Sequence, residues 1–268
     1  MNRARTPLSA LILTKDEERH IERCIRSLSF ADEVVVVDSG STDRTLELAR
    51  TCGARVVEQE WLGYSGQRNA GAAAATHDWV LWLDADELLS EELEASILKA
   101  LEGPMDPADG YVVERRNDFL GVLLPNEARE SKRRSFVRLY HRGHSRFDPD
   151  QLVHEEVRVP GRLVALDGVL LHWRGQSFTS IARVFVGYAD LEAEALDQAG
   201  VRATPPRMVG RTLARFAWVY LVKGYWRLGS RGLMYAMLKA NAEFLRYGRL
   251  WERQHLDGPV LDPPRDVR

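Results

Sequence analysis

The sequence predicts an α/β fold, a doubly wound and mostly parallel sheet flanked by helices, followed by a helical C-terminal extension. Three apolar runs, residues 8–13, 33–37 and 79–83, have the length and β-branched content of strands buried on both faces. Each run ends in a polar, acidic turn, and helix-like apolar spacing follows the first two turns. Strands that alternate with helices pair in parallel, so the three turns should meet at the carboxyl edge of the sheet, where ligands bind in such folds.

The first two turns each contain an expected helix start. The first apolar run leads into Thr14, and Thr14 with Glu17 matches a capping box ahead of a helix. The second run leads into Asp38, and Ser41 or Thr42 is expected to cap the helix that follows. These polar side chains should therefore lie at the edge of the sheet.

The third apolar run ends in two carboxylates one residue apart, Asp84 and Asp86. Side chains alternate between the two faces of a strand, so both carboxylates should project to the same side. Two hard oxygen ligands at this position suit Mg²⁺ or Mn²⁺ bridging to a diphosphate. The alternative is a strand end with solvated acids, but the two neighbouring acidic turns favour a ligand site.

Weaker patterns place the later elements. The segment 66–69 is expected to precede an alanine-rich helix, and Ser90 is expected to cap a helix that ends near Gly103. Further strands are expected over residues 111–115, 136–140 and 169–171.

Composition limits the function classes. The 268 residues can bury a full core, and the net charge of −2 gives no basic field that would indicate nucleic-acid binding. Cys24 and Cys52 are expected to be reduced thiols rather than a disulfide or a zinc site. We expect no signal peptide and no bilayer-spanning segment, and therefore a location in the cytoplasm or on its membrane face.

Four motifs occur in order, at residues 14–18, 37–45, 66–71 and 83–87. With these motifs the chain resembles the inverting nucleotide-sugar glycosyltransferases of family 2, which have the GT-A fold, over roughly residues 8–175. Within that family it most resembles the branch that adds glucose or a similar sugar to the inner core of bacterial lipopolysaccharide. The resemblance implies a nucleotide-diphosphate sugar as donor, UDP-hexose first, a divalent cation, and a lipid-linked saccharide as acceptor.

The donor is expected at the edge formed by the turns. The resemblance implies that Asp38 contacts the nucleotide and that Thr14 and Glu17 line the same pocket; a carboxylate there can accept hydrogen bonds from ribose or base. Arg68 is expected to bind the diphosphate or the base, and Asp84 to contribute to donor binding. Thr14 and Glu17 could instead be caps alone, and Arg68 a solvated arginine at a helix start.

Asp86 and His172 are the expected metal ligands. His172 follows an apolar run, as a polar residue at a strand end does. Several metal-dependent transferases of this fold use a histidine to complete the divalent site, and a neutral imidazole is a reasonable ligand for Mn²⁺. The alternative for His172 is a structural histidine with its hydrogen bonds satisfied.

An inverting transfer also needs a base to take the proton of the acceptor hydroxyl. The family places an acidic residue in the later half of its catalytic domain, and Glu155 matches that position by its order and by its preceding histidine. Asp148 and Asp150 are the alternatives, and Glu155 could also be a charged residue on an edge strand.

The last third of the chain changes character, which divides the sequence into a catalytic domain at 1–176 and a helical extension at 177–268. A helix capped near Ser177 should run to about Gln198. Residues 207–250 interleave aromatic and basic residues with one acid, which suits an anionic membrane interface, whereas the cations within the segment disfavour a span. The alternative is a helical hairpin with a basic outer face.

The expected function is metal-dependent, inverting transfer of a hexose to a hydroxyl of a lipid-linked saccharide such as the lipopolysaccharide core, on the cytoplasmic face of the inner membrane. A transferase of the same fold that acts on a carrier lipid or a protein is an alternative. A sugar nucleotidyltransferase would need a glycine-rich loop with Arg and Lys after the first strand, where this chain has the acidic segment 14–18. Paired carboxylates and a candidate base disfavour a noncatalytic nucleotide-binding module.

Overall fold

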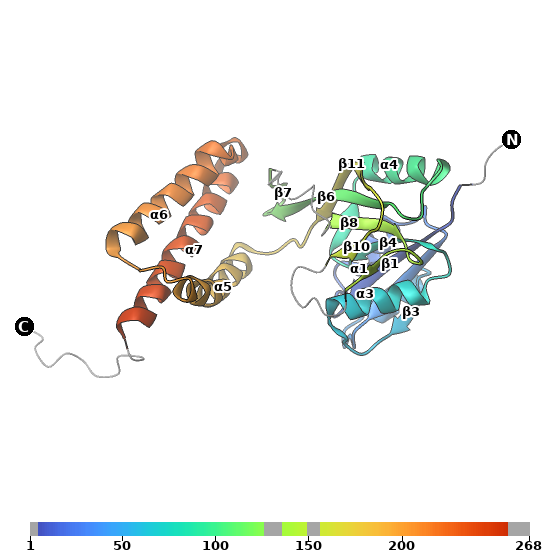
Figure 1. The fold of residues 1–268 in the computed structure, drawn as a ribbon, viewed down its shortest axis with the longest axis horizontal. Helices are drawn as coiled ribbons and strands as arrows, with labels where there is room; N and C mark the ends of the chain where they lie inside the picture. Colours follow the sequence, from blue (N-terminus) through green and yellow to red (C-terminus); the bar gives the residue numbers. More distant parts are fainter. Residues whose placement is uncertain (1–4, 126–135, 149–155, 257–268) are drawn as a thin grey trace, which may run out of the picture. The chain divides into compact units, whose positions relative to one another are not determined.

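The computed structural model describes residues 5–125, 136–148 and 156–256. These residues form two compact units, one built around a sheet and one built of helices (Figure 1). Among the described residues, no helix is both long and apolar enough to cross a membrane.

The division between the units does not follow the order of the chain. Of the described residues, 5–118, 136–148 and 156–174 form the sheet unit, and 119–125 and 175–256 form the helical unit. Residues 119–125 belong to the helical unit because the buried ring of Phe119 lies 5.1 Å from that of Tyr235 in the aromatic core of that unit. The division into a catalytic domain at 1–176 and a helical extension at 177–268 stays a prediction.

Half of the main sheet is parallel, as predicted. Its strands, in spatial order, are β3 (Arg55–Glu58), β2 (Glu33–Asp38), β1 (Leu8–Thr14) and β4 (Trp79–Asp84). Thr14 pairs with Asp38, and Leu13 pairs with Asp84, so the first residues of all three polar turns lie at one edge. The predicted α/β class with helices on both faces is confirmed.

The other half of the sheet is mixed. It continues with β8 (Val137–His141), β6 (Gly110–Phe119), β11 (Leu163–His172) and β5 (Glu87–Leu89), while β7 (Val122–Leu123) pairs with β6. β8 is antiparallel to both β4 and β6, and β5 is antiparallel to β11. A separate ribbon pairs β9 (Arg146–Phe147) with β10 (Val157–Arg158). Local sequence patterns do not reveal these long-range pairings.

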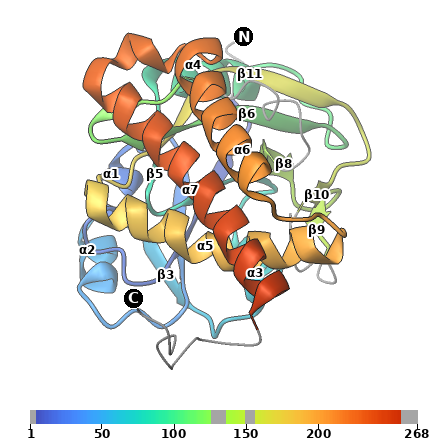
Figure 2. The ribbon, with the colours of Figure 1, turned by 90° about the vertical axis from the view of Figure 1, so that its left-hand side faces the viewer.

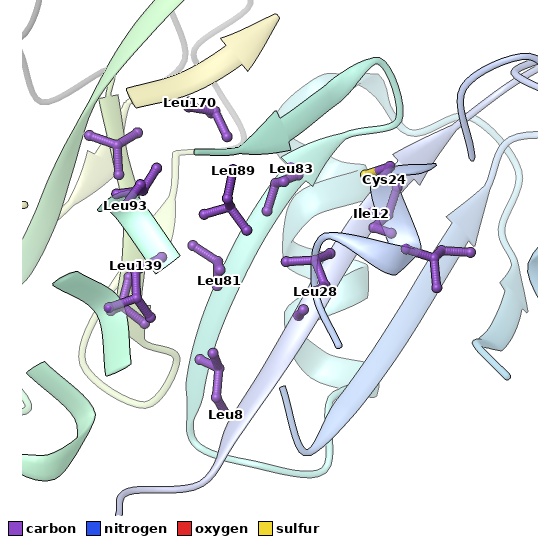
Figure 3. Close-up of a cluster of buried hydrophobic side chains, with 14 of the residues drawn as sticks. Leu8, Ile12, Cys24, Leu28, Leu81, Leu83, Leu89, Leu93, Leu139 and Leu170 are labelled. Carbon is purple, nitrogen blue, oxygen red and sulfur yellow. The ribbon is translucent and has the colours of Figure 1, made fainter. Parts of the chain in front are cut away.

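Alternation of side chains gives the sheet two buried faces. One face packs against α1 (Ile21–Arg26), α2 (Thr45–Thr51) and α4 (Glu91–Glu102), and the other packs against α3 (Gly63–Ala74). Figure 3 shows leucines of β4 and β5 with Ile12, Cys24 and Leu28 in the first cluster. Cys24 and Cys52 form no disulfide, as predicted, and burial raises the pKa of the Cys24 thiol.

Three of the predicted helix starts need correction, those at Thr14, at residues 66–69 and at Ser41 or Thr42. Thr14 is the last residue of β1, and α1 begins only at Ile21, without a side-chain cap. Oγ1 of Thr14 has no hydrogen-bond partner among the described residues, and the N–H of Glu17 donates to Oγ1 of Thr45 instead, so the capping box is wrong. The segment 66–69 lies inside α3 rather than before it. Ser90, by contrast, caps α4 as predicted, because its Oγ accepts the N–H of Leu93.

The helical unit consists of three main helices, α5 (Phe178–Gln198), α6 (Pro205–Ala217) and α7 (Gly229–His255), and α5 and α6 both pack along α7 (Figures 1 and 2). A π turn, η2 (Trp218–Val222), and a 3₁₀ turn, η3 (Tyr225–Leu228), join α6 to α7. Ser177 caps α5 as predicted. A Cβ at Gly232 would lie 1.8 Å from the carbonyl oxygen of Tyr225, so this close approach requires glycine.

Candidate active site

A cavity of about 440 Å³ opens at the carboxyl edge of β1 and β4. It is lined by Leu13, Thr14, Lys15, Glu17, Ser39, Trp61, Tyr64, Asp84, Ala85, Asp86 and Arg174. Each of the three polar turns contributes to this lining, which is the convergence expected from a parallel sheet. A larger hollow lies between α1, α2 and the start of β2, but it contains neither of the paired carboxylates.

The structure brings Asp86 and His172 together. Asp86 lies in the turn between β4 and β5, and His172 ends β11, which pairs with β5. The Nε2 atom of His172 is 3.0 Å from Oδ2 of Asp86, and its Nδ1 atom is 2.7 Å from Oδ1 of Asn117. Burial acts to raise the pKa of Asp86, but His172 and Arg174 outweigh it and hold that pKa well below its usual value. Asp86 is therefore ionised at neutral pH.

This pair fits a divalent cation. If Nδ1 of His172 donates its hydrogen to Asn117, a neutral ring presents the lone pair of Nε2 towards the Asp86 carboxylate, an arrangement that a cation would stabilise. Within the described part of the chain, no third His, Cys, Asp or Glu completes a metal site. Further ligands would have to come from elsewhere, such as the phosphates of a donor.

Arg174 donates a hydrogen bond to the same Asp86 oxygen that His172 contacts. Its Nε atom donates to Oδ2 of Asp86 at 2.7 Å, and its side chain is about half exposed in the cavity wall. Burial acts to lower the pKa of Arg174, but the bond to Asp86 outweighs it and the pKa is raised. The sequence interpretation missed this residue, although it lies only two residues after the predicted ligand His172.

Asp84 and Arg68 are also close together. Nη2 of Arg68 lies 3.7 Å from Oδ1 of Asp84, and the Arg68 guanidinium carbon lies 4.0 Å from the ring centre of Trp82. Arg138 contacts the same ring at 3.6 Å. Trp82 thus supports two cations, and Arg68 is held near the cavity rather than solvated at a helix start.

Glu87 fixes the turn that carries the acids. Its carboxylate is fully buried and accepts the N–H of Asp84 at 3.0 Å, an N–H of Arg138 at 2.8 Å and one of Arg115 at 3.4 Å. Burial raises the pKa of Glu87 and lowers that of Arg138, the directions expected for a buried ion pair that has lost its hydration. These contacts hold Asp84 in place at the end of β4.

The first and second turns are joined by reciprocal hydrogen bonds. The N–H of Asp16 donates to Oγ of Ser41, and Oδ1 of Asp16 accepts the N–H of Thr42. The N–H of Glu17 donates to Oγ1 of Thr45. Neither Ser41 nor Thr42 caps α2, so that prediction is wrong; both are used between the loops instead. The junction holds Glu17 at the cavity wall.

The buried carboxylate of Asp38 has hydrogen-bond partners within its own turn. Its carboxylate accepts the N–H groups of Gly40 and Ser41 and the hydroxyl of Ser41, which closes the second turn. The neighbouring Ser39, rather than Asp38, lines the cavity. The donor-binding role of Asp38 stays a prediction.

Thr14 and Glu17 both line the cavity. Oγ1 of Thr14 is buried and has no hydrogen-bond partner among the described residues, so it is available to a ligand in the cavity. Glu17 pairs with Nδ1 of His20 at 2.6 Å. Their roles in donor binding also stay predictions.

The candidate base Glu155 and the alternative Asp150 lie outside the described residues. Asp148 is described, and its carboxylate is ion-paired with Arg158. The choice among the three acids therefore stays a prediction.

The sheet, with Asp84, Asp86 and Arg174 lining one cavity at its carboxyl edge, has the architecture of a transferase of the GT-A class. The family model described as "Glycosyl transferase family 2" matches residues 9–155, and the chain belongs to this family of glycosyltransferases.

The relatives span almost the whole chain. The lipopolysaccharide core biosynthesis glycosyltransferase LpsC of Rhizobium meliloti is 32% identical over 257 residues, which are 93% of this chain and 94% of LpsC. The glycosyltransferase RT0209 of Rickettsia typhi is 31% identical, over 91% of this chain and 87% of its own. Among solved structures, TarS of S. aureus in complex with UDP-GlcNAc is similar with a TM-score of 0.48 and 16% identity, over 93% of this chain and 92% of that one.

Proposed function

We propose that this glycosyltransferase is a metal-dependent, inverting hexosyltransferase that uses a nucleotide-diphosphate sugar, UDP-hexose first, and a lipid-linked saccharide acceptor such as lipopolysaccharide core. The observation that carries the proposal is the 3.0 Å approach of His172 to Asp86 at a cavity that also contains Asp84 and Thr14. A carboxylate and an imidazole in this position suit a divalent cation that meets a diphosphate.

The chain's own residues would divide donor binding among them. Asp86 and His172 would hold the cation, which when bound neutralises charge on the departing diphosphate. Arg68 would contribute positive charge close to Asp84. Two exposed rings in the cavity wall, Trp61 and Tyr64, meet edge to face at 4.9 Å and offer apolar faces to a base or sugar.

Glu155 is the proposed base. In an inverting transfer the base takes the acceptor proton on the face of the sugar opposite the departing diphosphate. Asp148 is the less favoured choice because Arg158 already holds its carboxylate. Asp150 stays a second alternative.

The acceptor and the location rest on separate observations. The name of the relative LpsC supports a lipopolysaccharide core acceptor. Residues 199–242 contain eight Lys or Arg and no Asp or Glu, which favours peripheral binding to an anionic membrane, here the cytoplasmic face of the inner membrane. A carrier lipid or a protein is the alternative acceptor.

The decisive experiment is a screen of nucleotide sugars for hydrolysis or transfer by the purified full-length protein, with Mn²⁺, with Mg²⁺ and with EDTA. We expect one donor, UDP-hexose first, to be consumed only when a cation is present. Release of pyrophosphate from a nucleoside triphosphate and a sugar phosphate would instead identify a nucleotidyltransferase. Undiminished turnover in EDTA would contradict the metal-dependent mechanism.

A further inference from the structure

Two arginines and a tryptophan form one side of a hollow in the helical unit. Arg211, Arg215 and Trp218 follow one another at spacings of four and three residues, so they lie on one face of α6 and its continuation. Glu243 of α7 and Ala214 complete the lining of this hollow, which has a volume of about 300 Å³. We refer to these five residues as the arginine hollow.

Glu243 orients the two guanidinium groups. It is buried, and its carboxylate accepts one N–H of Arg211 at 3.1 Å and two of Arg215, each at 3.2 Å. A guanidinium has five N–H donors, so most donors of both side chains are left for other acceptors. Both arginines remain substantially exposed, 55% for Arg211 and 39% for Arg215.

The cluster has more positive than negative charge. Arg246 is a third cation on the same carboxylate, and Glu192 offsets it only at 3.5 Å. Burial acts to raise the pKa of Glu243, but the bonds from Arg246 and Arg215 outweigh it, so the pKa is lowered and the carboxylate is ionised. The hollow is therefore a pre-formed cationic site whose two arginines are held in place by the Glu243 carboxylate.

Exposed apolar side chains lie on the helix that carries the hollow and on the π turn that continues it. Trp218 is 51% exposed, and Leu213, Leu221 and Val222 are each more than 60% exposed. The helix α6, which the structure describes completely, has no buried residue. Large apolar side chains left in water beside cations are the pattern of a helix that lies in a membrane interface.

We propose that the arginine hollow binds the phosphate of an anionic lipid headgroup while Trp218 and the aliphatic residues beside it enter the lipid. Arginine recognises phosphate through paired N–H donors, and tryptophan favours the interfacial region. A soluble phosphate would use the arginines but would leave the exposed aliphatic residues without a role, so the lipid is the favoured source. This inference deepens the peripheral location in the proposed function and rests on that part of it alone.

The test is co-sedimentation of the full-length protein with phosphatidylcholine vesicles, with and without phosphatidylglycerol. Arg211→Gln and Arg215→Gln should each lower binding to the phosphatidylglycerol vesicles by about 10-fold or more, because each loses phosphate hydrogen bonds as well as charge. Arg207→Gln is the matched control, since Arg207 is on the same helix but outside the hollow, and it should lower binding by no more than about 5-fold.

Trp218→Ala keeps all three ion pairs to Glu243 and should also weaken vesicle binding. Equal losses for Arg207→Gln and the hollow variants would overturn the proposal in favour of diffuse attraction. Unchanged vesicle binding with a lowered melting temperature would overturn it too, because the arginines would then serve only to hold α6 on α7. Binding of inorganic phosphate that Arg211→Gln abolishes, with vesicle binding unaffected by Trp218→Ala, would assign the site to a soluble anion. None of these readouts depends on whether the donor assignment is correct.

Discussion

The imidazole of His172 contacts the carboxylate of Asp86 across 86 positions of sequence, with Nε2 3.0 Å from Oδ2. Pairing of β5 with β11 produces this contact, because Glu87 and His172 are opposite one another in the two strands. The same pairing brings Arg174 to Asp86, so one carboxylate oxygen is shared by an imidazole and a guanidinium. How these groups respond to a cation can be tested directly.

Asp86→Ala should abolish transfer, with a loss of about 10²-fold or more, because the cation that neutralises the diphosphate loses a ligand. Nucleotide binding should weaken chiefly in the presence of Mn²⁺ or Mg²⁺. Titration calorimetry with UDP, with and without the cation, measures this difference. Equal activity of variant and wild type would remove Asp86 from the metal site.

Arg174→Gln should tighten Mn²⁺ binding in the absence of nucleotide by about 10-fold, because Asp86 no longer has to give up a charged hydrogen bond to bind the ion. Electron paramagnetic resonance of free Mn²⁺ measures this affinity without any turnover. Arg50→Gln, which breaks an exposed ion pair to Glu58, is the control and should change nothing. If Mn²⁺ binds more weakly to Arg174→Gln, the arginine assists the cation instead of competing with it.

Glu155→Gln should lower turnover by about 10²-fold or more while donor affinity changes little, since the amide keeps the shape of the side chain but cannot accept the proton. Steady-state kinetics and donor binding separate the two effects. A collapse of donor affinity with normal turnover at saturation would make Glu155 a binding residue, and Asp148 or Asp150 would become the candidate base.

The parts of the fold that depend on local pattern could be predicted from the sequence. Buried parallel strands and their polar turns are visible as apolar runs with acidic ends, which is why Asp84 and Asp86 were placed correctly at the edge of the sheet. The predicted helix caps at Thr14 and Ser41 are wrong. Oγ1 of Thr14 has no hydrogen-bond partner among the described residues, and Oγ of Ser41 accepts the N–H of Asp16 in the neighbouring turn, which a local capping pattern does not reveal. Arg174 was missed for a similar reason, since its partner is set by antiparallel strand pairing.

Glu33 provides a pH-dependent test of the sheet unit. Burial acts to raise its pKa, but hydrogen bonds from Ser9, Thr76 and Arg55 outweigh it and lower the pKa from 4.5 to about 2. The ionised carboxylate therefore stabilises the fold above the ordinary pKa, and this contribution is lost as the pH falls from 4.5 towards about 2. Glu33→Gln should be less stable than wild type at pH 7, with the difference shrinking at pH 3 in urea denaturation. A difference that does not change with pH would mean that the hydrogen bonds, not the charge, stabilise this site.

The buried pair of Arg138 and Glu87 should govern the stability of the acidic turn. Arg138→Met removes the closer of two cations from a carboxylate that has no exposure to water, so the free energy of unfolding should fall by about 3–5 kcal/mol. Adding Glu87→Gln to this variant should restore part of the loss, because the unpaired charge disappears while an amide oxygen can still accept the N–H of Asp84. Arg116→Gln breaks a more exposed arginine–carboxylate pair and should cost no more than about 1 kcal/mol. Urea denaturation of wild type, these three variants and Glu87→Gln alone measures these differences. If the losses of the two single variants add up in the double variant, the two residues are not coupled.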